Sequence, residues 1–206
     1  MCIRDRSVYY NESPYYFRQS IDSLFNQSLQ LAEVVLVKDG ELTPELENVI
    51  TEYTAKYLQI RVVPLKQNQG LGKALNEGLK HCSYDLVARM DTDDIAKPNR
   101  FEKQISFFQE HPELDVVGAW IDEFEETTSN IISTRKLPEV HDDICQFAKK
   151  RNPENHPVIM FRKQAVLAAG GYQHFPLFED YYLWIRMLQN GAKSVSYTHL
   201  TLPTIR

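Results

Sequence analysis

Short apolar runs alternate with amphipathic segments along the first half of the chain. Such runs are typical of strands in a covered sheet, and they predict strands at 7–10, 34–37, 60–63 and 86–90. Between them, apolar residues recur every three or four positions, which predicts helices that begin near Pro14, Thr43 and Gly72. Four alternations of strand and helix favour an α/β fold, in which helices wrap an open, mostly parallel sheet.

The second half of the chain has a less regular pattern, which we interpret as an extension of the same domain. A cluster of turn-forming residues, Thr127–Asn130, predicts a hairpin or a long loop over 122–137. Further helices are predicted at 97–108, 140–150 and 178–187, and further strands at 114–121 and 155–161.

Three carboxylates follow the predicted strand at 86–90, at Asp91, Asp93 and Asp94. Crowded carboxylates raise each other's pKa unless a cation lies among them. Asp91 and Asp93 differ by two positions, so their side chains point the same way on an extended segment. Hard divalent cations accept carboxylate and phosphate oxygens together. The pattern therefore predicts either a metal site for a phosphorylated ligand or a solvated acidic turn that caps the next helix.

Another acidic residue, Asp39, ends the predicted strand at 34–37. Ligands of open α/β sheets bind beyond the carboxyl ends of the strands, so Asp39 and the acidic turn could line one crevice. The segment Gly70–Lys73 is no phosphate loop, because Ala74 follows the lysine where a serine or threonine is required. It favours a helix N-terminus packed on the sheet, whose N–H groups can still bind an anion.

The composition of the chain limits the classes of protein to which it can belong. The 206 residues suit one domain or a domain with a small appendage, and 43% are hydrophobic, enough for a core. A formal net charge of −5 without a basic run argues against a nucleic-acid partner. No apolar stretch approaches the roughly 18 residues of a membrane span. The three cysteines are scattered and are interpreted as free thiols in a reducing compartment.

Both ends of the chain fit the flanking patterns poorly. Residues 1–6 run into a strand without turn chemistry, and 195–206 follow neither a helix nor a strand pattern. Both resemble translated adaptor sequence, so we expect them to be non-native and the domain to occupy 7–194 as a piece truncated at both ends. We also expect residues 195–206 to lack a strand partner.

Several motifs, in this order, closely resemble glycosyltransferase family 2, whose members have the GT-A fold. These are Tyr9-Tyr10-Asn11-Glu12, Asp39-Gly40, Asn68-Gln69-Gly70, Asp91-Thr92-Asp93-Asp94, Pro98-Asn99-Arg100 and Glu179-Asp180-Tyr181. The resemblance covers residues 7–193 and implies a three-layer α/β/α domain. Three segments most resemble the branch that builds bacterial capsule, exopolysaccharide and O-antigen chains: Lys38-Asp39-Gly40, Asn155-His156-Pro157 and 179–184.

The resemblance implies a role for each matching residue. Asp39 would accept a hydrogen bond from the uracil N3–H, although Lys38 stands where many relatives have another Asp. Asp93 would be the direct ligand of Mn²⁺ or Mg²⁺, with Asp91 near the ribose and the metal. Arg89 and Arg100 are expected to orient these carboxylates. The expected substrate- and nucleotide-binding set is Glu12, Asp39, Asn68, Gly70, Asp91, Arg100, His156 and Glu179.

Asp180 matches the catalytic base of the family. A carboxylate there would deprotonate the acceptor hydroxyl as it attacks the anomeric carbon, and one displacement inverts that carbon. From these residues alone, the favoured interpretation of Glu179 and Asp180 is favourable charge at a helix N-terminus. The full ordered set of motifs favours catalysis instead. His156 is either a structural loop residue or a hydrogen-bond donor to the donor phosphates or the acceptor.

The resemblance implies an inverting, metal-dependent enzyme that moves a sugar from a UDP-hexose or similar nucleotide-diphosphate sugar to a saccharide or lipid-linked saccharide acceptor. We expect it in surface polysaccharide biosynthesis, in the cytoplasm, in peripheral association with the inner face of the plasma membrane. The alternative is a metal-dependent nucleotidyltransferase acting on a sugar phosphate. That class needs a glycine-rich, basic loop after the first strand, where Asn11–Pro14 stands instead.

Overall fold

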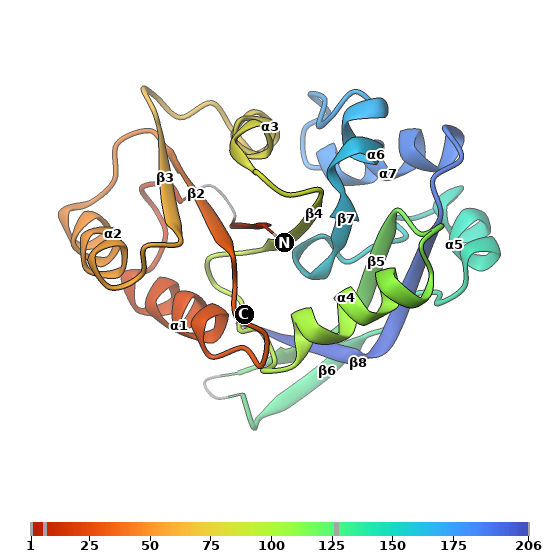
Figure 1. The fold of residues 1–206 in the computed structure, drawn as a ribbon, viewed down its shortest axis with the longest axis horizontal. Helices are drawn as coiled ribbons and strands as arrows, with labels where there is room; N and C mark the ends of the chain where they lie inside the picture. Colours follow the sequence, from red (N-terminus) through yellow and green to blue (C-terminus); the bar gives the residue numbers. More distant parts are fainter. Residues whose placement is uncertain (1, 6–7, 126–127, 206) are drawn as a thin grey trace.

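The computed structural model describes the backbone of residues 2–5, 8–125 and 128–205, and the side chains of 8–125 and 128–197. A twisted sheet runs through the molecule with helices on both faces (Figure 1). The strands are β1 Cys2–Asp5, β2 Glu33–Asp39, β3 Ile60–Leu65, β4 Leu86–Met90, β5 Val116–Phe124, β6 Ile131–Arg135, β7 Met160–Arg162 and β8 Ser194–Ile205. The helices are α1 Pro14–Phe25, α2 Pro44–Lys56, α3 Leu71–His81, α4 Arg100–Glu110, α5 His141–Ala148, the 3₁₀ helix η1 His156–Val158, α6 Lys163–Ala168 and α7 Glu179–Gln189.

The strand order is β3-β2-β1-β4-β7-β5-β6, and β8 pairs with β5. The four strands β3, β2, β1 and β4 are parallel, as the strand–helix alternation predicted. From β4 onward, β7 and β6 pair antiparallel with their neighbours, so the second half makes the sheet mixed. The predicted hairpin is confirmed, because β6 returns antiparallel along β5.

The first strand lies earlier than the sequence indicated. Cys2–Asp5 form β1, the strand between β2 and β4, inside the segment that we had set aside as non-native. The strand predicted at 7–10 is wrong for its described residues, since Val8 makes only an isolated bridge to Lys38. The chain then turns, with the Glu12 N–H donating to the Tyr9 carbonyl at 3.1 Å, which ends the strand at this point.

The expectation that residues 195–206 lack a strand partner is wrong for 195–205. They lie in β8, which pairs parallel with β5 from Val116 opposite Ser194 to Phe124 opposite Ile205. The ladder shifts register between Ala119 and Ile121. Because backbone N–H and C=O groups make the pairing, an open strand edge accepts an extended segment whatever its side-chain pattern.

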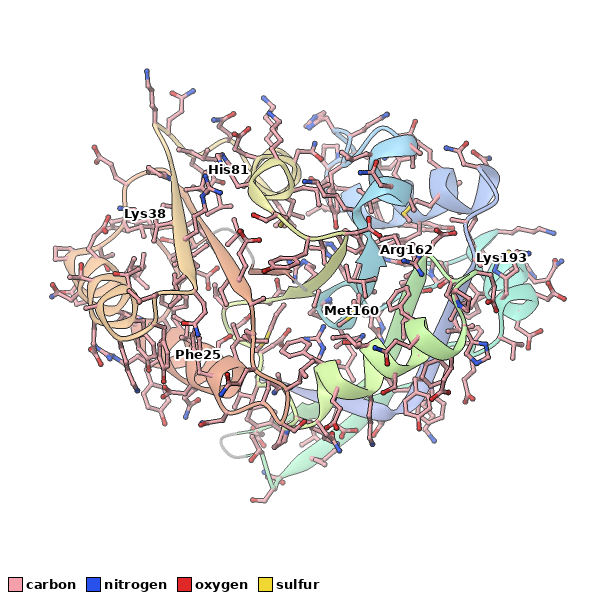
Figure 2. All side chains as sticks on the ribbon, viewed as in Figure 1. Phe25, Lys38, His81, Met160, Arg162 and Lys193 are labelled. Atoms are coloured by element: carbon pink, nitrogen blue, oxygen red, sulfur yellow. The ribbon has the colours of Figure 1, made fainter. Side chains whose placement is uncertain are left out.

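Two helical layers enclose the sheet, as predicted. Helices α3, α6 and α7 cover one face, and α1, α2 and α4 cover the other (Figure 1). Side chains fill the space on both sides, and Met160 of β7 belongs to the core beneath α4 (Figure 2). Helix α6 was not predicted, because six residues are too few for a periodic signal.

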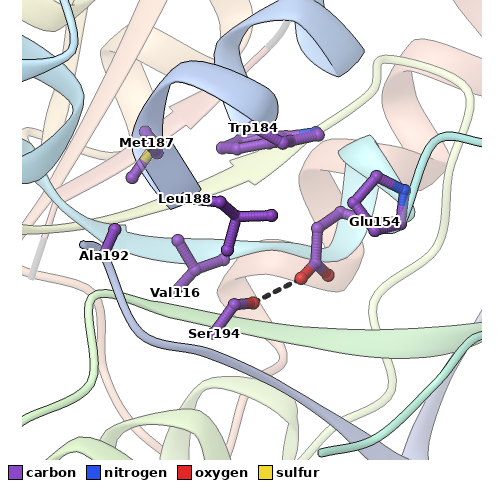
Figure 3. A pocket seen from close by; sticks show the side chains of 8 residues that line it. Val116, Glu154, Trp184, Met187, Leu188, Ala192 and Ser194 are labelled. Carbon is purple, nitrogen blue, oxygen red and sulfur yellow. Dashed lines mark hydrogen bonds between the residues drawn. The ribbon is translucent and has the colours of Figure 1, made fainter. Parts of the chain in front are cut away.

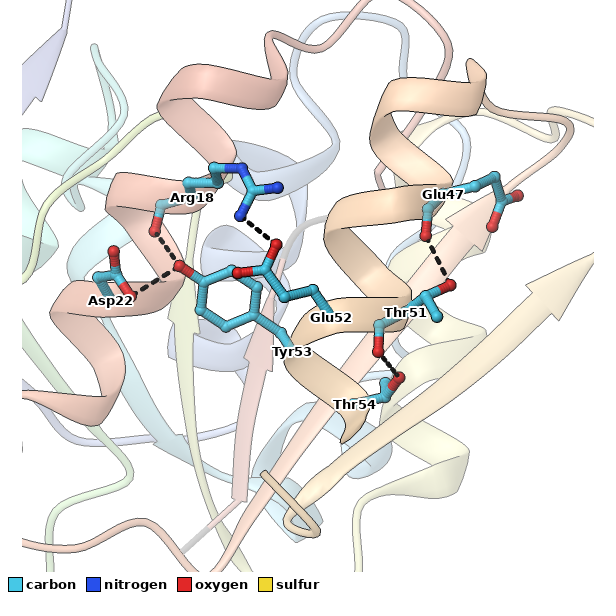
Figure 4. A network of polar contacts seen from close by, with 7 residues as sticks. All are labelled: Arg18, Asp22, Glu47, Thr51, Glu52, Tyr53 and Thr54. Carbon is cyan, nitrogen blue, oxygen red and sulfur yellow. Dashed lines mark hydrogen bonds and ion pairs between the residues drawn. The ribbon is translucent and has the colours of Figure 1, made fainter. Parts of the chain in front are cut away.

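A polar network joins α1 to α2 (Figure 4). The Tyr53 hydroxyl donates to Asp22 Oδ1 at 2.7 Å, and Arg18 pairs with Glu52 at 2.6 Å. The pKa of Tyr53 is raised to about 12, mainly by burial and next by the hydrogen bond to Asp22. The network fixes α1 against α2, and α1 in turn holds the turn that follows β4.

Within the described part of the chain, no helix has the length and apolar character needed to cross a membrane.

Candidate functional site

The acidic turn after β4 is pinned to α1. The Ser20 hydroxyl donates to the Asp91 carbonyl at 2.9 Å, and Ser23 Oγ accepts the Ala96 N–H at 3.0 Å. Inside the turn, the Asp94 N–H points to the Asp91 carbonyl at 3.4 Å. These bonds satisfy backbone groups where the strand ends and fix the turn to α1. Asp91 and Asp93 remain partly exposed there, while Asp94 is buried.

Arg89 lies beneath the turn as a buried cation. Its guanidinium forms an ion pair with Asp91 Oδ1. An ion pair with one buried partner holds the carboxylate in one orientation and offsets part of its charge.

Arg100 is fully buried and braces the same region from α4. It donates to the Arg89 carbonyl at 2.7 Å, to the Pro157 carbonyl at 3.3 Å and to Gln104 Oε1 at 3.1 Å. Burial lowers the pKa of Arg100 to about 9, with the charge of Asp94 opposing that shift. The expected orienting role agrees with this placement. Direct contact with a nucleotide does not, because no part of the side chain reaches the surface.

Asp39 ends β2 and caps the segment before α3. Its Oδ1 accepts the Gln69 N–H at 2.7 Å and its Oδ2 accepts the Gly70 N–H at 3.2 Å. Asn68 Oδ1 also accepts the Gly70 N–H, at 3.1 Å. A carboxylate at a helix N-terminus is electrostatically favourable. Some N–H groups that we expected to bind a ligand anion are therefore occupied by Asp39 itself.

Glycine is required where these two loops meet. Gly40 has φ +93°, and a Cβ there would lie 2.7 Å from the Asn68 backbone nitrogen. Glu12 belongs to the same corner, because its loop follows Val8, whose carbonyl accepts the Asp39 N–H at 2.9 Å. Three members of the predicted nucleotide-binding set, Glu12, Asp39 and Asn68, thus come from separate segments that adjoin at this corner.

The first turn of α7 meets the first turn of α3. A Cβ at Gly72 would lie 3.3 Å from Glu179 Cγ, so Glu179 packs beside the start of α3. Asp180, the next residue, accepts a hydrogen bond from Asn152 Nδ2 to Oδ2 at 2.6 Å. Because α3 begins beyond the carboxyl end of β3, this contact places Glu179 and Asp180 at the end of the sheet where the acidic turn lies.

His156 lies beside the residues at the first turns of α3 and α7, where it contacts Tyr172. Its Nε2 lies 3.0 Å from the Tyr172 hydroxyl, and its ring meets Trp184 edge to face with centroids 6.0 Å apart. Asn76 of α3 holds the Tyr172 backbone with two hydrogen bonds, at 2.6 and 2.8 Å. These contacts favour the structural alternative for His156, whose side chain nevertheless stays partly exposed.

Four polar residues that hold site residues in place were not predicted from the sequence. Asn152 holds Asp180, Tyr172 contacts His156, Asn76 holds Tyr172, and Gln104 accepts from Arg100. Asn76 and Tyr172 are 96 positions apart, so no local pattern connects them. Two of the four lie close in sequence to predicted site residues, because Asn152 is four positions before His156 and Gln104 is four positions after Arg100.

The acidic residues fit a metal that arrives with its ligand. Among the described residues, no group of three or more His, Cys, Asp and Glu side chains is arranged to hold an ion. Mg²⁺ in nucleotide sites typically takes one or two carboxylates and completes its shell with phosphates and water. Asp91 and Asp93 supply such a partial set of oxygen ligands, both accessible from solvent.

Comparisons with known proteins place the chain among sugar transferases. The sequence profile of Glycosyl transferase family 2 matches residues 8–170. An "Uncharacterized glycosyltransferase" of Haemophilus influenzae is 48% identical over 185 residues, which are 90% of this chain and 68% of that protein. The "Amylovoran biosynthesis glycosyltransferase AmsE" of Erwinia amylovora is 46% identical over the same shares. The "UDP-Gal:alpha-D-GlcNAc-diphosphoundecaprenol beta-1,3-galactosyltransferase" of Escherichia coli is 36% identical, over 90% of this chain and 67% of that protein.

Solved structures share the fold. S. aureus TarS superposes with a TM-score of 0.75 at 19% identity, and a 1–349 form in complex with UDP-GlcNAc gives 0.77 at 18%. Each covers 100% of this chain, whereas the chain spans 36% and 58% of those structures. The predicted GT-A fold is confirmed.

Proposed function

The chain belongs to Glycosyl transferase family 2, and from that premise we propose that it transfers a sugar from a UDP-linked donor to a hydroxyl of a saccharide acceptor in surface polysaccharide biosynthesis. The names of the Erwinia and Escherichia relatives support this assignment. The Escherichia relative is named for a UDP-sugar donor and a diphosphoundecaprenol-linked acceptor, and it supports the same classes of substrate here. Such an acceptor would bring the enzyme to the inner face of the plasma membrane.

One observation carries the proposal. A braced pair of carboxylates, Asp91 and Asp93, lies at the same end of the sheet as a third carboxylate, Asp180, that another loop holds in place. A metal-bound donor diphosphate needs the first pair. An attacking hydroxyl needs a separate base, and Asp180 comes from a different element.

Asp180 takes the proton in the proposed reaction. Asn152 occupies Oδ2, which leaves Oδ1 to accept the acceptor hydroxyl proton. As that proton moves, the hydroxyl oxygen bonds to the anomeric carbon and the bond from that carbon to the diphosphate oxygen breaks. UDP leaves with the electron pair. A single displacement of this kind inverts the anomeric configuration.

Asp93, assisted by Asp91, would hold Mn²⁺ or Mg²⁺. A bound ion would stabilise the negative charge on the departing diphosphate as a Lewis acid. The Arg89 ion pair keeps Asp91 in a fixed orientation. The family resemblance assigns direct coordination to Asp93. At the other end of the donor site, Asp39 and Glu12 are assigned to the uracil, since a carboxylate oxygen has a second lone pair beside the one used by a backbone N–H.

An assay with the full-length protein tests the proposal. The protein is incubated with a panel of UDP-sugars and Mn²⁺ or Mg²⁺, and released UDP is measured by coupled enzymes with and without saccharide acceptors. Metal-dependent release of UDP, at least by slow hydrolysis, supports a transferase. Release of pyrophosphate from a nucleoside triphosphate and a sugar phosphate would instead favour a nucleotidyltransferase and overturn the proposal.

A further inference from the structure

The outer face of α7 carries an aromatic hollow of about 320 Å³. Phe175 and Phe178 on its rim are 49% and 50% exposed, and their rings lie edge to face with centroids 6.2 Å apart. Beside them, Leu177 is 90% exposed and has φ 70°, a backbone conformation that leucine rarely adopts. Exposed aromatic groups gathered in this way mark a binding surface. The lining residues are Phe175, Phe178, Tyr181, Tyr182 and Ile185.

A second hollow continues the first toward α5. Its volume is about 560 Å³, and Tyr181 and Ile185 line both hollows, so the two adjoin each other along α7. The Tyr181 hydroxyl donates to the Ala148 carbonyl at 2.6 Å, which fixes the end of α5 against α7. Lys149 lines the α5 side of this second hollow. We call the two hollows together the α7 groove.

Three consecutive cationic residues follow the end of α5. Lys149, Lys150 and Arg151 are all exposed, in a chain whose net charge is −5. Lys149 donates to Gln146 Oε1 at 2.8 Å, and the described residues give none of the three an ion pair with a carboxylate. The acidic residues of α7 face elsewhere, since Glu179 packs beside Gly72 and Asp180 accepts from Asn152.

The cations adjoin both the groove and the loop that holds the assigned base. Lys149 lines the groove, and Asn152, the residue after Arg151, holds Asp180. In the sequence, Asp180 also lies between Phe178 and Tyr181, which line the groove. An aromatic groove, a cationic stretch and a carboxylate base are therefore neighbours, and they match the apolar chain, the diphosphate and the sugar hydroxyl of an amphiphile.

We propose that the α7 groove with Lys149, Lys150 and Arg151 binds the prenyl diphosphate part of a lipid-linked saccharide acceptor. The apolar chain lies on the aromatic side chains, because it removes their exposed surface from water. The diphosphate pairs with the cations, among which Arg151 can offer a bidentate contact. The sugar then reaches Asp180. The inference rests on the proposed transfer function, whose acceptor it specifies.

Farnesyl diphosphate is a probe that requires no knowledge of the sugar. Its binding to the full-length protein is measured by calorimetry below its micelle concentration, with the donor site saturated by UDP and Mg²⁺. The charge reversal Lys150→Glu with Arg151→Glu should weaken binding at least about tenfold. Phe178→Ala should weaken it roughly fivefold through lost apolar burial. Farnesol and inorganic pyrophosphate should each bind more weakly than the intact probe.

Matched controls lie at the opposite edge of the sheet. Lys56→Glu with Arg61→Glu reverses the same charge on the exposed surface of α2 and β3, and Leu58→Ala removes an exposed apolar side chain between them. Neither change should alter binding of the probe. Equal weakening by Lys56→Glu with Arg61→Glu would show a general charge effect and overturn the proposal.

Other outcomes also decide the matter. Binding of the probe without UDP that is lost when UDP is added would place the probe in the donor site. Absence of binding to the full-length protein would show that the groove is not a site for a prenyl diphosphate. Either result overturns the assignment of the groove. UDP affinity is read separately in every variant. Failure to bind UDP would end the proposed function, whereas normal UDP binding with unaltered probe binding in the groove variants ends only this inference.

Discussion

Glu154 is a buried carboxyl group in the loop that leads to His156. It is 2% exposed and lines a small cavity of about 10 Å³ together with Val116, Trp184 and Met187 (Figure 3). Its Oε1 accepts a hydrogen bond from the Ser194 hydroxyl, while Oε2 has no hydrogen-bond partner among the described residues. Burial raises the pKa of Glu154 to about 8, although the hydrogen bond from Ser194 opposes the shift.

The shift makes stability depend on pH with a defined sign. Between about pH 4.5, where the unfolded group titrates, and about pH 8, the folded state holds a proton that the unfolded state has released. The free energy of unfolding therefore falls as the pH rises through this window. At roughly 1.36 kcal/mol per pH unit, about 5 kcal/mol of stability is lost between pH 4.5 and pH 8, of which about 3 kcal/mol is lost by pH 7.

Glu154→Gln removes the titration and keeps the shape. We expect the variant to be more stable than the wild type by about 3 kcal/mol at pH 7 and to match it within about 1 kcal/mol near pH 4.5. Urea unfolding followed by tryptophan fluorescence at fixed ionic strength, from pH 4.5 to 8, measures both values. Glu110→Gln makes the same chemical change at an exposed position of α4 and should leave the pH dependence of the wild type unchanged.

The amide of the Glu154→Gln variant can itself lower stability, because its buried N–H₂ group needs a hydrogen-bond acceptor. Glu154→Leu therefore serves as a second, apolar variant that cannot titrate. The reasoning is wrong if both variants retain the wild-type pH dependence of stability between pH 4.5 and 8. It is equally wrong if the wild type shows no loss of stability across that window.

Three further predictions concern the assigned site. Asp180→Asn should lower sugar transfer by about 10²–10⁴-fold with donor affinity unchanged, and Glu179→Gln should cost less; a near wild-type rate or a product with retained configuration by NMR would contradict the mechanism. Asp93→Asn should greatly weaken Mn²⁺- or Mg²⁺-dependent UDP binding in calorimetric titration, and unchanged metal-dependent affinity would refute the metal assignment. Asp39→Ala should weaken UDP binding by about 1–3 kcal/mol with metal dependence intact. It should also destabilise the fold by about 1–3 kcal/mol, because two backbone N–H groups lose their acceptor. Unaltered UDP affinity together with unaltered stability in urea would exclude both roles.

The sequence by itself determined most of the elements and the chemical character of the site. The apolar periodicity located strands β2, β3 and β4 and helices α1, α2 and α3 because it reports which side of each segment is buried. The acidic turn after β4 was readable because the strand and its three carboxylates are adjacent in the chain. The ordered motifs indicated the family, which the comparisons confirm.

Contacts between distant segments were decided only by the tertiary structure. The sequence could not show that Asp39 caps the loop at Gln69 and Gly70, or that Asn152 holds Asp180, since a hydrogen bond depends on where packing brings its two partners. Nor could it show which edge of β5 receives residues 195–205. Glu154, a charged residue in a polar stretch, gave no local sign of burial, because the desolvation that shifts its pKa comes from side chains of β5 and α7 that only the fold places around it.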